Sequence, residues 1–262
     1  MPSEATTAAQ AGTTAEREPI LSCVDLSKRF GGVHALDKVS FEVRRGEVLA
    51  LAGDNGAGKS TLIKTISGVH KPDEGEMRFK GNRISLDNPR HARELGIETI
   101  YQDLALADNL DVGANVFLGR EPTTRFLGLE RLDRPKMRAV AHDVLETLDI
   151  DIPKRKLREP VRNLSGGQRQ AVAIGRAIYW NAELLIMDEP TAALGVPEQR
   201  KVKELILRLK DQNVAIIFIS HNLVDIFDVS DRIMVLRRGI KAGERRPAET
   251  DHNEVVRLMI GG

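Results

Sequence analysis

The sequence has a single cysteine, no excess of either charge and no long apolar run. Cys23 has no partner in the chain for a disulfide, which is typical of a protein in a reducing compartment such as the cytosol. We expect it to be a small residue packed in an N-terminal strand. With 39 basic and 38 acidic residues the net charge is +1, and this balance argues against a nucleic-acid partner, which usually meets a concentrated basic surface.

No apolar run approaches the roughly 18 residues that are needed to cross a bilayer. The longest runs, residues 48–51, 184–187 and 214–219, have the length of buried strands. The first residues, MPSEATTAAQAGTTAEREP, lack the basic start and apolar centre of a secretion signal. Their bias to small and polar residues predicts a disordered tail over residues 1–18.

Short apolar runs alternate with amphipathic segments along most of the chain. Predicted strands cover residues 20–26, 39–43, 47–52, 76–80, 97–101, 183–187, 214–219 and 232–236. Predicted helices cover residues 61–67, 89–95, 166–179, 197–210, a segment from 222, and 253–260. This alternation predicts an α/β fold with a parallel sheet and helices on its faces. Residues 103 to about 162 lack strong strand runs, so we predict a mostly helical insertion with helices at 108–118 and 133–148 and a linker between them.

Residues 53–60, GDNGAGKS, fit the phosphate-loop pattern G-x-x-x-x-G-K-[ST] between a predicted strand and a predicted helix. Gly53, Gly56 and Gly58 let backbone N–H groups approach a phosphate chain closely, and the following helix directs its positive end at the anion. Lys59 is placed to reach the β- and γ-phosphates, and Ser60 to ligate Mg²⁺. The sequence therefore predicts a site for a nucleoside triphosphate.

Two further stretches complete such a site. The apolar strand ELLIMDE ends in Asp188, which can hold Mg²⁺ through water, and in Glu189, which can polarise an attacking water. LSGGQ, residues 164–168, opens a helix whose free N–H groups form a second anion-binding end. A second anion-binding helix end is hard to use within one monomer, because the phosphate loop already serves one γ-phosphate. If two copies face head to tail, the LSGGQ turn of each copy can cap the nucleotide bound by the other.

In this order the three motifs resemble the ATP-binding subunit of an ABC transporter, over nearly all of residues 20–260. The resemblance implies a P-loop NTPase (RecA-like) core with an N-terminal antiparallel β subdomain and the helical insertion, in one domain over residues 19–262. Gln102 matches the Q-loop glutamine, which senses Mg²⁺ and the attacking water and faces the transporter. His221 matches the switch histidine at the γ-phosphate, and Phe30 the aromatic residue that stacks on adenine. His34 matches no functional residue of the family pattern, and we predict that it lies in a loop.

The resemblance assigns three groups of residues. The catalytic group is Glu189, His221 and Gln102. The nucleotide-binding group is Phe30, Gly53, Asp54, Asn55, Gly56, Ala57, Gly58, Lys59, Ser60, Thr61, Ser165, Gly166, Gly167 and Gln168. The Mg²⁺ ligands are Ser60, Gln102 and Asp188.

One position departs from the family pattern. Gly195 stands where an aspartate normally helps to link the two nucleotide sites across the dimer. We expect altered coupling between the sites, with ATP binding retained because the residues that hold ATP are intact. Hydrolysis should be retained because Glu189 and His221 are both present.

The stretches YQDLALADNLDVGANVFLGRE and ISHNLVDIFDVSDRIMVLRRG resemble monosaccharide importers of the ribose, xylose and fructose type. This implies a peripheral ATPase on the cytoplasmic face of the inner membrane, a homodimer that binds permease subunits and depends indirectly on a periplasmic sugar-binding protein. The ATPase of an amino-acid or lipid importer has the same motifs. A soluble ABC ATPase without a membrane partner is the other alternative, although such proteins usually carry coiled-coil insertions, tandem cassettes or cysteine clusters.

Overall fold

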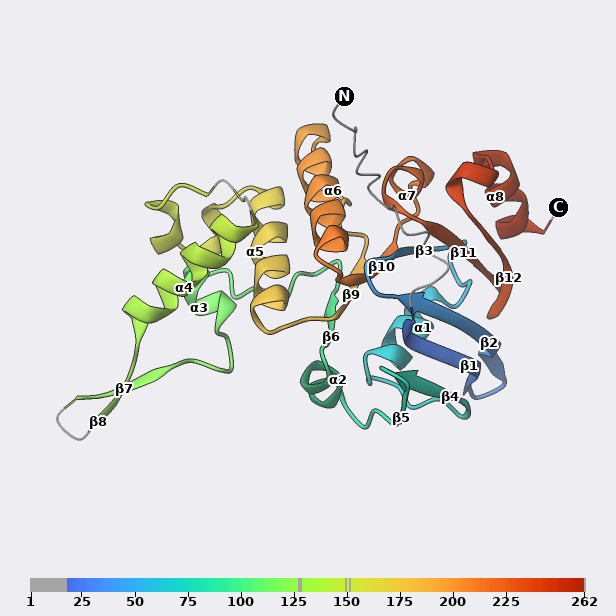
Figure 1. The fold of residues 1–262 in the computed structure, drawn as a ribbon, viewed down its shortest axis with the longest axis horizontal. Coiled ribbons are helices and arrows are strands. Elements are labelled where there is room, and N and C mark those ends of the chain that lie inside the picture. Colours follow the sequence, from blue (N-terminus) through green and yellow to red (C-terminus); the bar gives the residue numbers. More distant parts are fainter. Residues whose placement is uncertain (1–17, 127–128, 149, 151, 262) are drawn as a thin grey trace, which may run out of the picture.

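The computed structural model describes residues 18–126, 129–148, 150 and 152–261, so the predicted tail, apart from Glu18, lies outside the described residues. Figure 1 shows an α/β body that holds two sheets, and beside it a helical part with α3, α4 and α5 from which a hairpin extends. The predicted fold class, an α/β core with an antiparallel β subdomain and a helical insertion, is confirmed.

A six-stranded sheet with the order β12-β11-β3-β10-β9-β6 forms the centre of the body. The strands that run parallel are β6 (Ile97–Ile100), β9 (Leu184–Asp188), β10 (Ala215–Ile219), β3 (Val48–Ala52) and β11 (Arg232–Arg237). Every residue of β3 and β10 is buried, which explains why their sequences are unbroken apolar runs. β12 (Ile240–Arg245) lies outside the predicted strands, and it pairs antiparallel with β11 at the sheet edge.

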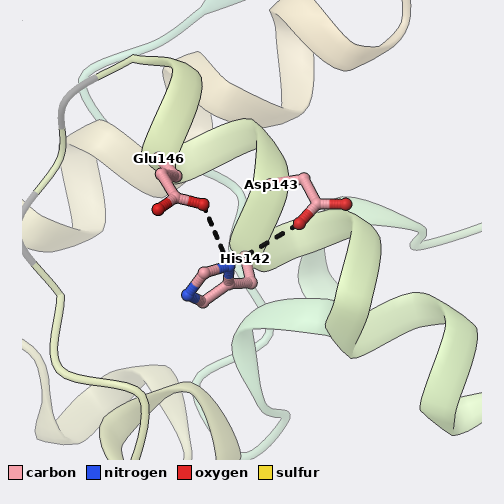
Figure 2. A group of neighbouring side chains, drawn as sticks. All are labelled: His142, Asp143 and Glu146. Carbon is pink, nitrogen blue, oxygen red and sulfur yellow. Dashed lines mark ion pairs between the residues drawn. The ribbon is translucent and has the colours of Figure 1, made fainter.

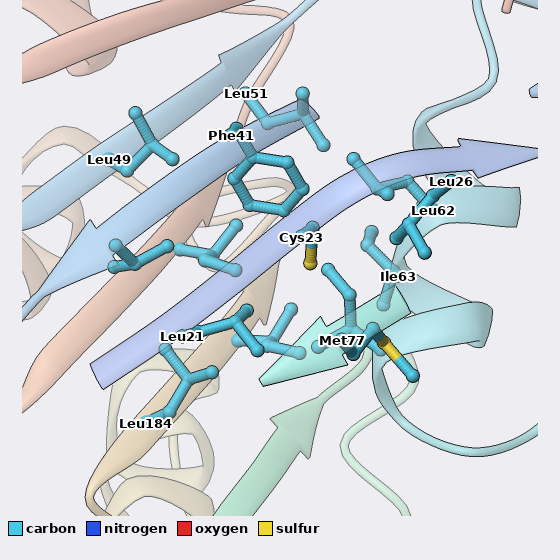
Figure 3. Packing of buried hydrophobic residues seen from close by; sticks show 14 of the residues in the cluster. Leu21, Cys23, Leu26, Phe41, Leu49, Leu51, Leu62, Ile63, Met77 and Leu184 are labelled. Carbon is cyan, nitrogen blue, oxygen red and sulfur yellow. The ribbon is translucent and has the colours of Figure 1, made fainter. Parts of the chain in front are cut away.

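A four-stranded antiparallel sheet has the order β2-β1-β4-β5. Its strands are β1 (Pro19–Phe30), β2 (Val33–Arg44), β4 (Glu74–Phe79) and β5 (Asn82–Ile84). Helix α1 (Lys59–Ile66) contributes buried Leu62 and Ile63 to the apolar cluster that joins this sheet to the central one. Figure 3 shows Cys23 of β1 inside that cluster, as predicted, and burial raises the pKa of its thiol, which therefore stays protonated.

The helical part is built from α3 (Val112–Val116), α4 (Arg134–Thr147) and α5 (Gly166–Tyr179), which share an apolar cluster of their own. Asp133 caps α4 as predicted. The helix predicted over residues 108–118 is wrong in length, because Asp111 caps α3 from inside that span by accepting a hydrogen bond from Ala114 N at 2.8 Å.

The linker predicted over residues 119–132 is also wrong. It contains an antiparallel hairpin of β7 (Thr123–Phe126) and β8 (Leu129–Leu132). All four residues of β8 are exposed, so no buried face imposes an alternating apolar pattern on this strand.

The remaining helices are α2 (Pro89–Leu95), α6 (Val196–Asp211), α7 (Leu223–Val229) and α8 (His252–Ile260). Helix α6 buries the apolar face that its sequence pattern predicts: Val202, Leu205, Ile206 and Leu209. Short 3₁₀ turns occur at Lys156–Arg158, Val161–Asn163 and Pro247–Glu249. Among the helices of the described residues, none has the length and apolarity to span a bilayer.

A buried ion pair connects the two sheets. The carboxylate of Glu47, which is fully buried, accepts hydrogen bonds from Arg44 N and from Arg232 Nη1, both at 2.7 Å. Arg232 Nη1 also donates to the Glu42 carbonyl oxygen at 3.4 Å. Arg232 of β11 is therefore the counter-charge of Glu47, which lies in the segment between β2 and β3.

We expect Arg232→Met to lower the free energy of unfolding by about 3–5 kcal/mol, because it leaves the Glu47 carboxylate buried without its counter-charge. Urea unfolding followed by circular dichroism measures the change. Arg90→Met removes an exposed ion pair with Glu94 and is the matched control, with an expected change below about 0.5 kcal/mol. Equal losses in the two variants would contradict the prediction.

Candidate functional site

The phosphate loop and the ends of several strands line one cleft of about 940 Å³. Residues 53–61 follow β3, Gln102 follows β6, Asp188 and Glu189 lie at the end of β9, and His221 follows β10. Because parallel strands place their carboxyl ends at one edge of the sheet, residues that are far apart in the sequence meet there. The structure thus brings together most of the residues that the sequence assigns to triphosphate, metal and water.

Two glycines of the loop permit close backbone approach. Gly53 has a φ of +152°, and a Cβ there would lie 2.4 Å from the Leu236 carbonyl oxygen. Gly58 has a φ of +106°, and a Cβ there would lie 2.7 Å from the Ala35 carbonyl oxygen. Because Gly58 is the N-cap of α1 and has no side chain, the first N–H groups of this helix face the cleft without a side-chain cap.

The Lys59 ammonium lies across the phosphate loop. Its Nζ donates to the carbonyl oxygens of Gly53 and Asp54, the latter at 3.1 Å. Burial lowers the pKa of Lys59, while the negative charges of Glu189 and Asp188 act in the opposite direction. These contacts place a cation beside backbone N–H groups, which is an arrangement that binds anionic phosphate.

Two carboxylates and a histidine face the loop from the ends of β9 and β10. Glu189 has a φ of +53°, its N–H donates to the Ile219 carbonyl oxygen at 2.9 Å, and its Oε2 lies 2.8 Å from His221 Nδ1. Burial and the neighbouring Glu189 charge raise the pKa of Asp188, against the opposing effects of Lys59 and Lys64. Oxygen ligands that crowd negative charge in this way suit a hard divalent cation.

Two predicted groups lie elsewhere in the described chain. Phe30 is not among the residues that line this cleft, and its ring packs edge-on against His70 with centroids 5.1 Å apart. The LSGGQ helix end opens on a different groove, of about 380 Å³, which Ser165, Gly167 and Gln168 line. There Ser165 and Gln168 form a capping box, with Gln168 N donating to Ser165 Oγ at 3.3 Å. A single chain therefore keeps its phosphate loop and its LSGGQ turn apart.

The cleft also contains residues that the motifs do not identify: Val33, His34, Ala35, Arg238 and Met259. The prediction that His34 lies in a loop is wrong, because it belongs to β2 and pairs with Arg29 of β1. Arg238 reaches the cleft because its neighbour Gly239 donates to the Ala57 carbonyl oxygen at 2.9 Å, which ties this turn to the phosphate loop. Contacts of this kind join distant segments, so no local sequence signal reveals them.

A separate group of possible ligands occurs on α4, where Figure 2 shows His142, Asp143 and Glu146. His142 Nδ1 lies 3.6 Å from one carboxylate oxygen of each acid. The side chains of Asp143 and Glu146 are 76% and 74% exposed, so we interpret the group as surface ion pairing between residues of one helix.

Comparison with protein families matches residues 36–192 to the family described as ABC transporter. The chain is 49% identical over 240 residues to a xylose/arabinose import ATP-binding protein of Sulfolobus acidocaldarius, with 92% of this chain and 93% of the relative covered. It is 45% identical to a fructose import ATP-binding protein of Rhizobium meliloti, with 94% and 95% covered. It also matches a galactofuranose transporter ATP-binding protein of Escherichia coli at 44% identity, but spans only 48% of that relative.

Comparison with solved structures also matches the chain to ATP-binding cassettes of ABC transporters. A nucleotide-free ATP-binding cassette from an ABC transporter superposes with a TM-score of 0.78 at 28% identity, covering 94% of this chain and 96% of the other. An ATP-binding cassette of an ABC transporter in its ADP conformation superposes with a TM-score of 0.78 at 27% identity, covering 94% and 100%.

The raised pKa of Asp188 has a consequence for the nucleotide-free protein. The folded state disfavours the ionised form of the Asp188 carboxylate, so this group lowers the free energy of unfolding at pH values above its ordinary titration range. The destabilisation is lost at acidic pH, where Asp188 is protonated in both the folded and the unfolded state. Asp188→Asn should therefore raise Tm by roughly 1–3 °C at about pH 7, and by less toward about pH 4.

Differential scanning calorimetry across this pH range measures the effect. Asp73→Asn is a control of opposite sign, because hydrogen bonds from Lys28 and from Arg29 N lower the pKa of Asp73. A lower Tm for Asp188→Asn at about pH 7 would overturn the prediction.

Proposed function

The chain belongs to the ABC transporter family, and we propose on that basis that it hydrolyses ATP to energise the import of a monosaccharide. The observation that best supports hydrolysis is the single cleft that holds the phosphate loop, Lys59, Asp188, Glu189 and His221. This set provides anion binding, metal binding and a base for water, which together are the requirements of phosphoryl transfer to water.

The phosphate loop would hold the triphosphate through its N–H groups and through Lys59. The oxygens of Ser60, Gln102 and Asp188 would hold Mg²⁺, and the crowded negative charge at Asp188 fits this assignment. The bound cation would neutralise charge on the phosphates. Glu189 would accept a proton from the attacking water, and His221, 2.8 Å from the Glu189 carboxylate, would hold that side chain in place until the γ-phosphate arrives.

The nucleoside end of ATP would lie at the opposite wall of the cleft. The polar and apolar side chains there come from Val33, His34, Arg238 and Met259. Phe30 would have to turn away from His70 to stack on adenine. The base therefore meets a wall made of β2, the turn after β11 and α8.

Two chains would close head to tail over two ATP molecules. The LSGGQ turn lies outside the cleft of its own chain, so a second chain is needed to bring such a turn to each γ-phosphate. ATP favours the closed dimer because only there does it contact both chains. At Gly195 a Cβ would lie 2.7 Å from Glu198 Oε2, so an aspartate at this position would require the end of the Glu198 side chain to move.

The permease would dock in a second cleft, of about 860 Å³, between α2 and β6 on one side and Arg120 and Trp180 on the other. Tyr101 and Ala105 line this cleft and Gln102 lines the nucleotide cleft, so the segment at 101–105 connects the two. Arg176 holds that segment by donating to the carbonyl oxygens of Leu104 and Ala105.

Charge in the second cleft favours an acidic partner segment. Arg90, Arg93, Arg120 and Arg176 line it against Glu94 and Glu98, and burial raises the pKa of Glu98. A permease loop with an acidic side chain would complement this excess of arginine. The chain would then lie on the cytoplasmic face of the inner membrane, with a periplasmic binding protein and the permease selecting the sugar.

We expect Glu189→Gln to lower kcat for ATP by roughly 10²–10⁴-fold, because the amide cannot take the proton of the attacking water. The same variant should accumulate as an ATP-bound dimer, which light scattering detects. Glu249→Gln, at an exposed surface position, is the matched control. A monomeric variant beside an inert wild type would contradict the head-to-tail mechanism.

We expect Arg93→Glu to weaken retention on membranes that contain the co-expressed permease by about tenfold, which corresponds to about 1.4 kcal/mol. Its ATP affinity in solution should not change, since Arg93 lies outside the nucleotide cleft. Arg83→Glu, on β5, is the matched control. Retention without any permease would argue against this docking surface.

A further inference from the structure

Asp225 is a buried carboxylate that the proposed mechanism does not use. It lies in the first turn of α7, and its side chain is 3% exposed. A carboxylate at this depth needs several donors, and three from different segments reach it. Thr191 Oγ1 donates to Asp225 Oδ2 at 2.9 Å, Asn222 Nδ2 to the same oxygen at 3.1 Å, and Lys203 Nζ to Oδ1 at 3.0 Å.

Two of these donors, Thr191 and Asn222, belong to the two loops that carry the proposed chemistry. Thr191 is two residues after Glu189, and Asn222 directly follows His221. Asp225 Oδ2 accepts from both, so one oxygen atom fixes the loop after β9 relative to the loop after β10. Lys203 of α6 neutralises the carboxylate and also donates to Asp228 Oδ2 at 2.6 Å.

The same network reaches the segment that would face the second chain. Gln199 Nε2 of α6 donates to the carbonyl oxygens of Leu194 at 3.0 Å and of Thr191 at 3.4 Å. Residues 191–194 are therefore held between α6 and α7. A shift of this segment would pull on Thr191 and, through Asp225, on Asn222 and His221.

We propose that Asp225 is a positioning residue, which holds Glu189 and His221 in register through Thr191 and Asn222. Glu189 has a left-handed φ, a conformation that persists only where the surroundings enforce it. The ladder bond from Glu189 N to Ile219 O fixes its backbone on one side, and the Thr191–Asp225 bond fixes the chain two residues later. This inference rests on the proposed role of Glu189 in hydrolysis.

The test severs one bond of the network and leaves the carboxylate with its other two donors. Thr191→Val removes the hydroxyl at nearly constant volume, Thr191→Ser restores a hydroxyl, and Ser230→Ala removes an unrelated hydroxyl at the far end of α7. Steady-state kinetics on the full chain, with folding checked by circular dichroism, give kcat and KM for ATP. We expect Thr191→Val to lower kcat by roughly 10–100-fold with KM within about twofold, and Thr191→Ser to recover most of kcat.

The outcomes separate this inference from the function on which it rests. If the wild type hydrolyses ATP and Thr191→Val matches it in kcat, Asp225 does not position the loops. If Thr191→Ser is as slow as Thr191→Val, or if Ser230→Ala is equally slow, the effect is one of general stability and the inference is overturned. If the wild type itself does not hydrolyse ATP, the proposed function fails, and if Glu189→Gln turns over ATP as fast as the wild type, Glu189 is not the base and the premise of this inference fails.

Discussion

The parallel pairing of β3, β10 and β9 is the constraint on which the rest of the structure depends. The ladder places Val48 beside Ile216 and Leu184 beside Ala215, and this register fixes the edge at which each strand ends. The phosphate loop, the acidic pair and His221 become neighbours because they lie at or directly after the carboxyl ends of those strands. Cover on both faces of the sheet allows these strands to be apolar except for Asp188 at the end of β9, and places the polar chemistry at the strand ends and in the loops.

Charge in the cleft bears on how the two proposed ligands would bind. Lys59 faces two carboxylates, and burial together with the neighbouring Glu189 charge raises the pKa of Asp188. A triphosphate alone would add to that negative charge, and a divalent cation alone would face Lys59 and the positive end of α1. Each of the two proposed ligands would offset part of the charge that the other brings, so we expect nucleotide and metal to bind as one unit.

The sequence predicts those parts of the fold in which the local backbone conformation or burial demands a particular residue type. The phosphate loop, the fully buried strands and the apolar face of α6 each carry a pattern that the observed packing explains. The hairpin β7–β8 was missed because exposed β8 carries no buried face, and α3 was predicted too long because its cap, Asp111, lies inside the predicted span. The cleft wall of His34 and Arg238 could not be predicted either, since both residues reach it through contacts between segments that are distant in sequence.

The burial of Cys23 makes this chain convenient for chemical labelling. It is the only cysteine in the sequence, and it lies 2% exposed within the apolar cluster between the sheets, with its thiol protonated. Thiolate is the reactive form, so maleimides and spin-label reagents should spare the folded native chain. Cysteines introduced at exposed positions such as Val196 could then be labelled singly, and fluorescence or spin–spin distances could test the proposed approach of two chains without prior removal of the native thiol.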